Sequence, residues 1–196
     1  MEKNGEYYLY TTFVKPDENA RTYVLKSDRP EGPFLFAGRN SISSHSLDGF
    51  DQSCIAPDID GEPFVDDDGT AYLFWRRRMA ARMTDDWQHL TGDTVVMSTA
   101  RQGYSEGPVM FKRKGIYYYI YTLRGNQNYV NAYMMSRQSP LSGFEKPEGN
   151  DIFLFSSIAD NVWGPGHGNV FYNEEINRGC VSAAYMFAVI HKAAQK

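Results

Sequence analysis

The sequence has 196 residues, which is enough for one domain with a sizeable core. Its formal net charge of −4 excludes the strongly basic surface that nucleic-acid-binding proteins use, and no apolar run is long enough to span a membrane. The 14 Tyr and 12 Phe favour β-structure and sugar-contacting surfaces and argue against disorder.

The two cysteines, Cys54 and Cys180, are too few for a disulfide framework and lack the spacing of a metal site. We expect both to be small buried residues. The N-terminus is polar from its second residue and shows no signal peptide.

The first strand-like segment covers residues 6–14 and follows a charged turn that ends at Gly5. Residues 15–19 form a turn cluster, and residues 22–26 are predicted to be the returning strand.

A second unit of the same kind surrounds the acid-rich turn at residues 66–69. Asp and Gly tolerate the positive φ that tight hairpins need, so a turn is predicted there, with strands at 71–77 and 79–84. The twelve-residue ligand loop of an EF-hand is absent, so we interpret Asp66, Asp67 and Asp68 as a solvated turn and not as a calcium site.

The third unit has a turn at residues 112–115, followed by predicted strands at 116–122 and 129–136. Lys112, Arg113 and Lys114 are interpreted as exposed residues of this turn and not as a nucleic-acid-binding patch. The glycines that open the three units, Gly5, Gly69 and Gly115, are 64 and 46 residues apart. Periods of about 40–50 residues that each hold several short strands are typical of β-propeller blades.

The connection after each outer hairpin also recurs. Residues 27–34 and 136–144 both run from a serine through a proline turn to a glycine and an aromatic residue. The repeat therefore includes the whole module. Within the first copy, Glu31-Gly32-Pro33 is interpreted as structural.

The ends of the chain depart from this repeat. The sequence opens inside what resembles the second strand of a blade, and no aromatic hairpin follows residue 175. We expect residues 1–196 to form a single, partial all-β propeller of about three to four blades. Residues 176–196 are either a divergent C-terminal segment or the product of a shifted reading frame. Open blade edges would allow self-association.

Three residues stand where the innermost strand of a blade would begin. They are Asp60, Glu106 in Glu-Gly-Pro, and His167 in a glycine-rich approach to an apolar run. Convergent carboxylates with a histidine suit acid–base hydrolysis of a glycosidic bond. The alternatives are a turn-forming Asp, a loop Glu and a hydrogen-bonded loop His.

Taken in order, three motifs resemble glycoside hydrolase family 43. They are Ile59-Asp60 with Phe64–Leu73, Glu106-Gly107-Pro108 with Lys112–Tyr119, and Gly164-Pro165-Gly166-His167-Gly168. The resemblance spans roughly residues 5–175. It implies a five-bladed β-propeller that acts on plant cell-wall polysaccharides, as a β-xylosidase, α-L-arabinofuranosidase, arabinanase or related enzyme.

The resemblance also implies roles for these residues in hydrolysis with inversion. Glu106 matches the general acid, and Asp60 matches the Asp that orients this acid and modulates its pKa. His167 matches a histidine that in many members neighbours or coordinates an axial calcium or sodium ion; no cofactor is otherwise required. Trp75 and Trp163 either stack on the sugar or pack between blades.

One part of the family pattern has no counterpart here. The general base is an Asp about a dozen residues before the first aromatic strand, which would place it before Met1. The first Asp of this sequence is Asp17, in a predicted hairpin turn, and it is no substitute. We therefore expect little hydrolysis by this chain alone.

Three functions remain open from the sequence. The first is inverting hydrolysis of xylose- or arabinose-containing polysaccharides, and the second is binding of these polysaccharides by a non-catalytic, truncated propeller. A structural propeller for protein contacts is a third reading, and it leaves the order of the three motifs unexplained. The expected partner is a carbohydrate, with no nucleic acid and no membrane.

Overall fold

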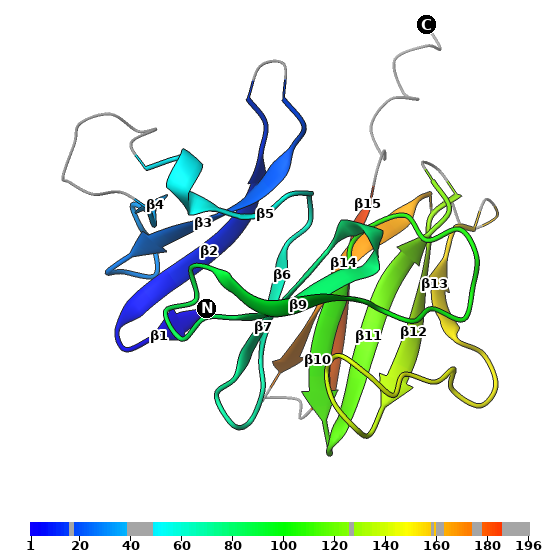
Figure 1. The fold of residues 1–196 in the computed structure, drawn as a ribbon. Coiled ribbons are helices and arrows are strands. Elements are labelled where there is room, and N and C mark those ends of the chain that lie inside the picture. The colour runs from blue at the N-terminus through cyan, green and yellow to red at the C-terminus, as the bar shows by residue number, and fades with distance from the viewer. Residues whose placement is uncertain are drawn as a thin grey trace, which may run out of the picture. The chain divides into compact units, whose positions relative to one another are not determined.

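The structure is a computed structural model that describes residues 1–15, 18–38, 49–125, 128–157, 159, 163–173 and 178–185 (Figure 1). These residues form β-strands and two short 3-10 helices, so the predicted all-β class is confirmed. No helix in these ranges is long and apolar enough to cross a membrane. The chain divides into two compact units, Met1–Val95 and Val96–Lys196, which are described separately.

The first sheet of unit 1 confirms the two predicted N-terminal strands. Its order is β1 (Glu2–Lys3), β2 (Glu6–Phe13), β3 (Arg21–Ser27) and β4 (Leu35–Phe36), with β5 (Cys54–Ala56) also paired to β3. The expectation that no strand precedes β2 was wrong. Lys3 pairs with Glu6 and Glu2 with Tyr7, across a tight turn at Asn4-Gly5 in which both residues have positive φ.

The second sheet of unit 1 has the order β6 (Glu62–Val65), β7 (Ala71–Trp75), β8 (Met79–Met83) and β9 (Leu90–Val96). The predicted turn is present, because the Asp66 N–H donates to the Thr70 carbonyl at 2.9 Å. Strand β7 ends two residues earlier than predicted. Arg77 has a φ of 65°, which leaves the extended conformation, and Arg76–Arg78 form a 3-10 turn.

The core of unit 1 lies between these two sheets. Alternate residues of each strand face inward, as the two-residue period of a strand requires. Val24 from β3 and Leu73 from β7 are fully buried, and Tyr8 packs edge-on against Trp87 at 5.4 Å between ring centroids. Burial of each large apolar side chain contributes roughly 1.5–3 kcal/mol, so this contact surface joins the two sheets firmly.

A second cluster covers the other face of the first sheet. Tyr23 stacks on Phe50 at 4.3 Å between ring centroids, and Phe13 and Phe36 pack edge-on around them. Cys54 packs against this cluster but is only half-buried, so the expectation that it is a buried residue was wrong. The Cys180 side chain lies outside the described part of the structure.

Unit 2 contains the third predicted module. Its four-stranded sheet has the order β10 (Val109–Arg113), β11 (Ile116–Leu123), β12 (Val130–Ser136) and β13 (Ile152–Phe155). Strands β14 (Pro165–Asn173) and β15 (Arg178–Tyr185) form an antiparallel pair, and β14 lies against β10, β11 and β12. The predicted strands at 116–122 and 129–136 are confirmed as β11 and β12.

The repeated serine has the same structural role in both modules. The Ser27 hydroxyl accepts the Arg29 N–H at 3.1 Å, and the Ser136 hydroxyl accepts the Gln138 N–H at 3.0 Å. Each serine is buried at the end of its strand. Such side-chain-to-backbone bonds favour a turn over further strand pairing, so the duplication extends to hydrogen bonding.

Candidate active site

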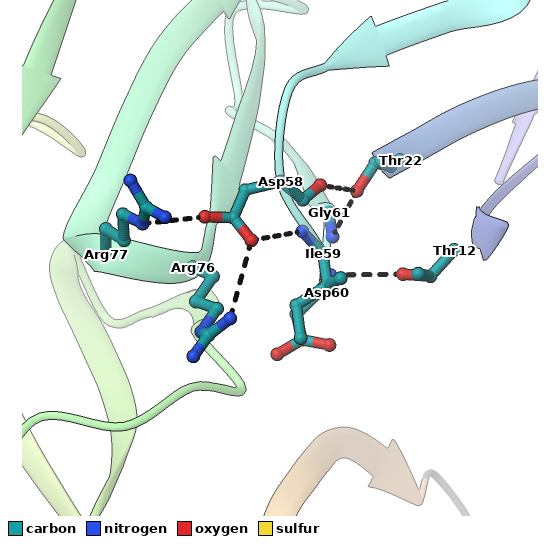
Figure 2. Close-up of polar contacts among 8 residues, drawn as sticks. All are labelled: Thr12, Thr22, Asp58, Ile59, Asp60, Gly61, Arg76 and Arg77. Carbon is teal, nitrogen blue, oxygen red and sulfur yellow. Dashed lines mark hydrogen bonds and ion pairs between the residues drawn. The ribbon is translucent and has the colours of Figure 1, made fainter. Parts of the chain in front are cut away.

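Asp60 lies in the loop between β5 and β6 of unit 1 and has a left-handed backbone, with a φ of 64°. Its N–H donates to Thr12 Oγ1 at 3.3 Å, and the Gly61 N–H donates to Thr22 Oγ1 at 3.1 Å (Figure 2). This conformation costs a residue with a Cβ about 1–2 kcal/mol. The two threonines offset that cost, and the half-buried Asp60 carboxylate points away from them.

The loop also packs closely on the threonine side. A Cβ at Gly61 would lie 2.3 Å from Thr22 Cγ2, much closer than real contacts allow. Glycine is therefore required directly after Asp60. Thr22 is itself fully buried on β3, so the loop rests against a fixed surface.

Asp58 supports the same loop through its carboxylate and its carbonyl. Its Oδ1 accepts the Ile59 N–H at 2.9 Å, and its Oδ2 lies 2.9 Å from Arg77 Nε (Figure 2). Arg76 Nη1 lies 3.8 Å from Oδ1, while the Thr22 hydroxyl donates to the Asp58 carbonyl at 2.8 Å. Asp58 thus links the loop that holds Asp60 to β3 and to the turn after β7.

Glu106 lies in unit 2, in the segment that leads into β10, and it is half-buried. The Tyr129 hydroxyl donates to Glu106 Oε1 at 2.7 Å, the short distance expected of a bond to a carboxylate. The Thr122 N–H donates to the Glu106 carbonyl at 3.0 Å. Tyr129 and Thr122 therefore fix both the side chain and the backbone of Glu106. The other carboxylate oxygen, Oε2, is not the one that Tyr129 contacts.

His167 lies on β14 with an exposed side chain and a φ of 39°. The ladder between β14 and β15 shifts register between Gly166 and Gly168, which places His167 at a bulge. Its N–H donates to Thr122 Oγ1 at 3.0 Å. A Cβ at Gly107 would lie 2.8 Å from the His167 Cα, so the Glu106-Gly107 backbone packs directly on His167.

Unit 2 therefore brings two of the three predicted residues together. Thr122 contacts Glu106 through its N–H and His167 through its hydroxyl. Tyr129, which holds Glu106, lies against β14, because a Cβ at Gly166 would be 2.7 Å from its ring. Asp60 belongs to unit 1 and is described only within it.

The two tryptophans differ in their surroundings. Trp75 is 3% exposed and belongs to the core of unit 1. Trp163 is half-buried and lies two residues before β14 in unit 2.

An axial cation was implied at His167. In the described part of the chain, no three side chains among His, Cys, Asp and Glu come together as a metal-binding group. The axial cation stays an expectation, and the hydrolysis proposed for this chain uses none.

Glu62 is a titratable group that the sequence did not single out. It is the first residue of β6, two positions after Asp60, and its carboxyl is half-buried. Burial raises the pKa of Glu62 to about 7. This carboxyl therefore changes its charge near neutral pH.

Sequence reasoning also missed Asp58, Thr122 and Tyr129. Asp58 had a signal, since Asp58-Ile59-Asp60 places a second carboxylate beside the first. Thr122 and Tyr129 had none, because they meet Glu106 only through the pairing of β11 and β12.

The model of glycosyl hydrolases family 43 matches residues 1–185. The match continues past the span of 5–175 on which the sequence resemblance was based, into β15.

Known proteins similar to this chain include two curated relatives. A β-D-galactofuranosidase, xynD, of Aspergillus niger is 29% identical over 175 residues, which cover 84% of this chain and 48% of the relative. A xylosidase/arabinosidase of Butyrivibrio fibrisolvens is 26% identical over 188 residues, covering 86% of this chain and 34% of the relative. The chain thus spans half or less of these relatives.

Among solved structures, a glycoside hydrolase superposes with a TM-score of 0.75 at 41% identity. The match covers 91% of this chain and 40% of that structure. The predicted class, an incomplete all-β propeller, is confirmed by these likenesses.

Proposed function

The chain belongs to glycosyl hydrolase family 43, and from that premise we propose that it serves in the inverting hydrolysis of xylose- or arabinose-containing cell-wall polysaccharides. The observation that supports this most is the fixed position of Glu106. Its Oε1 is held by Tyr129 at 2.7 Å, and its backbone is held by Thr122.

In this proposal Glu106 is the general acid. Because Tyr129 occupies Oε1, the proton is carried by Oε2 and passes to the leaving-group oxygen as the glycosidic bond breaks. Asp60 keeps the orienting and pKa-modulating role that the family resemblance implies. Its loop is held by Thr12, Thr22 and Asp58 before any substrate binds.

Glu106 and Asp60 do not supply the general base of an inverting reaction. Inversion needs a base on the opposite side of the sugar, about 6.5–9.5 Å from the acid, to activate water. None of the residues that the structure describes is assigned this role here, so carbohydrate binding without turnover is the second candidate function.

One paired experiment tests both candidates. The chain is titrated calorimetrically with xylo- and arabino-oligosaccharides and assayed with aryl β-xyloside and aryl α-L-arabinofuranoside. We expect binding with little turnover. Rapid cleavage that Glu106→Gln abolishes would support Glu106 as the general acid. It would also contradict the expectation that this chain turns over little substrate for lack of a general base. Absence of both binding and cleavage would overturn the carbohydrate function.

A further inference from the structure

We propose that unit 1 contains a subsite for a carboxylate-bearing sugar, such as a uronic acid, in a pocket beside the Asp60 loop. This inference rests on the proposed carbohydrate function and specifies the substrate class. The pocket has a volume of about 590 Å³, and Asp58, Ile59, Trp75, Arg76 and Arg77 contribute to its wall. We call it the arginine pocket. Its volume is within the roughly 300–1,000 Å³ range of small-molecule sites.

The charge of the arginine pocket favours an anion. Two guanidinium groups, of Arg76 and Arg77, face one carboxylate, that of Asp58 (Figure 2). Asp58 is the only ion-pair partner that the described residues offer to these two arginines. The pocket wall therefore contains two arginines and one carboxylate, an excess of one positive charge among its lining residues.

The geometry leaves donors available for a ligand. Asp58 engages Arg77 through Nε at 2.9 Å, so both terminal nitrogens of Arg77 remain for another acceptor. Arg76 approaches Asp58 only to 3.8 Å, which is longer than a hydrogen bond. The Arg77 side chain is 78% exposed and that of Arg76 is 46% exposed, whereas Asp58 is 13% exposed. A planar guanidinium can bind a carboxylate through two parallel N–H groups.

The backbone holds the arginines at this place against a conformational cost. Arg77 and Arg78 both have a φ of 65°, a left-handed conformation that is unfavourable for residues with a Cβ. The Arg76 N–H donates to the Ile59 carbonyl at 3.1 Å, which attaches the turn to the Asp60 loop. An arginine run that only faces solvent would need neither the left-handed backbone nor the hydrogen bond to Ile59.

The remaining wall suits a sugar ring. Met79 and Leu90 contribute half-buried apolar surface on which C–H groups can pack, and Asn19 and Thr94 contribute exposed polar groups for hydroxyls. Ile59, which precedes Asp60, also lies in the wall. A sugar bound here would contact the same loop that holds Asp60.

The test compares two ligands that differ only in charge. One is a xylo-oligosaccharide with a single glucuronic acid branch; the other is the same molecule after reduction of its carboxyl to an alcohol. Calorimetric titration of the 196-residue chain at low salt should give about tenfold tighter binding of the charged ligand, as expected for charge-assisted hydrogen bonds. The difference should shrink at 0.5 M salt.

Substitution of each arginine tests whether the ligand carboxylate binds at Arg76 and Arg77. Arg77→Gln and Arg76→Gln should each reduce the preference for the charged ligand to about twofold or less and leave binding of the reduced ligand unchanged. The matched control is Arg82→Gln, which removes an exposed arginine of β8 that does not line the pocket. The control should keep the tenfold preference, and all three variants should unfold at the wild-type temperature within about 2 °C.

The outcomes separate this inference from the proposed function. Equal affinity for the two ligands would overturn the anionic subsite and leave carbohydrate binding standing. A charge preference that survives both arginine variants would also overturn it, because the carboxylate would then bind elsewhere. If neither ligand binds, the carbohydrate function itself fails and the subsite fails with it.

Discussion

At the scale of single residues, glycine determines how closely the loop and strand backbones approach each other. Gly61 packs on Thr22 beside Asp60, and Gly107 packs on His167 beside Glu106. In both places the residue directly before the glycine is a candidate site residue, Asp60 or Glu106. A methyl group at either position would move the neighbouring carboxylate.

Gly61→Ala should destabilise the chain by about 2–3 kcal/mol, because its Cβ would overlap Thr22 Cγ2 and no flexible side-chain end can move away. Urea unfolding measures the loss. Gly125→Ala is the matched control, since a Cβ there meets nothing within 4 Å, and it should cost less than about 0.5 kcal/mol. Adding Thr22→Ser, which removes the Cγ2 methyl, should recover part of the loss. A Gly61→Ala chain as stable as wild type would show that the loop does not pack on Thr22.

Glu62 gives unit 1 a pH dependence. Its folded pKa is about 7, above the ordinary value of 4.5, so the folded state binds the proton more tightly than the unfolded state. The stability that the protonated carboxyl contributes is fully present below pH 4.5 and is lost as the pH rises through 7.

Glu62→Gln should therefore be more stable than wild type at pH 8, by about 1–2 kcal/mol, and equal to it near pH 4. Thermal unfolding from pH 4 to 8 measures this difference. The exposed Glu31→Gln is the control and should follow the wild type throughout. A stability difference that does not change with pH would contradict the raised pKa.

At this scale the sequence predicted part of the candidate site. Asp60, Glu106 and His167 were recognised because each belongs to a local motif. Tyr129 was not, because its hydroxyl reaches Glu106 across 23 positions of sequence and only after strand pairing. Trp75 could equally have been a sugar platform or a core residue, since its surroundings depend on how two sheets pack.

At the scale of elements, an ion pair between a partly exposed arginine and a buried aspartate fixes the connections around the sheet of unit 2. Asp151 precedes β13 and is fully buried, and Arg101 lies ahead of β10. Arg101 donates to both carboxylate oxygens, at 2.8 Å from Nε and 2.6 Å from Nη2. These hydrogen bonds from Arg101 hold the pKa of Asp151 below its ordinary value. The stability from this pair is present above the ordinary pKa of 3.8 and is lost as the pH falls through the folded pKa.

Asp151→Asn should cost about 2 kcal/mol at pH 7 and less at pH 3, because below the ordinary pKa of 3.8 the wild-type carboxyl takes up a proton on unfolding and the ion pair stabilises the fold less. Chemical denaturation at both pH values tests this. Glu148→Gln, an exposed change nearby, should have little effect at either pH. Equal losses at the two pH values would mean that the charge of Asp151 does not stabilise the fold.

The strands that the sequence predicted are β2, β3, β7, β8, β11 and β12, and all of them except β8 (Met-Ala-Ala-Arg-Met) are rich in aromatic or β-branched residues. The ones it missed are short or lie at sheet edges. Strand β4 has only two residues, and β9 contains Gly92 and Asp93, which disfavour strands. Pairing with a neighbour forms these strands, and a single sequence does not carry that information.

At the scale of the whole molecule, the outermost strands of the described sheets are places where another chain can pair. Strand β13 is last in the order of its sheet, and Phe153 and Phe155 on it are 39% and 59% exposed. An exposed apolar edge strand is a template for pairing with another chain.

We therefore predict concentration-dependent self-association of the chain, measured by sedimentation velocity between about 5 and 200 µM. Phe155→Lys should weaken it at least threefold, because a charge on an edge strand opposes pairing. Replacement of the exposed Val14 by Lys, in the other unit, is the control and should have little effect. A sedimentation coefficient that is constant across this range would contradict the prediction.

The double role of Thr122 has a consequence for how unit 2 fluctuates. One residue holds the carbonyl of Glu106 and the amide of His167, so the two segments that meet at this strand end cannot loosen independently. Any transient opening at the end of β11 exposes both to solvent at once. We therefore expect the candidate acid and its neighbouring histidine to open to solvent as a single cooperative unit.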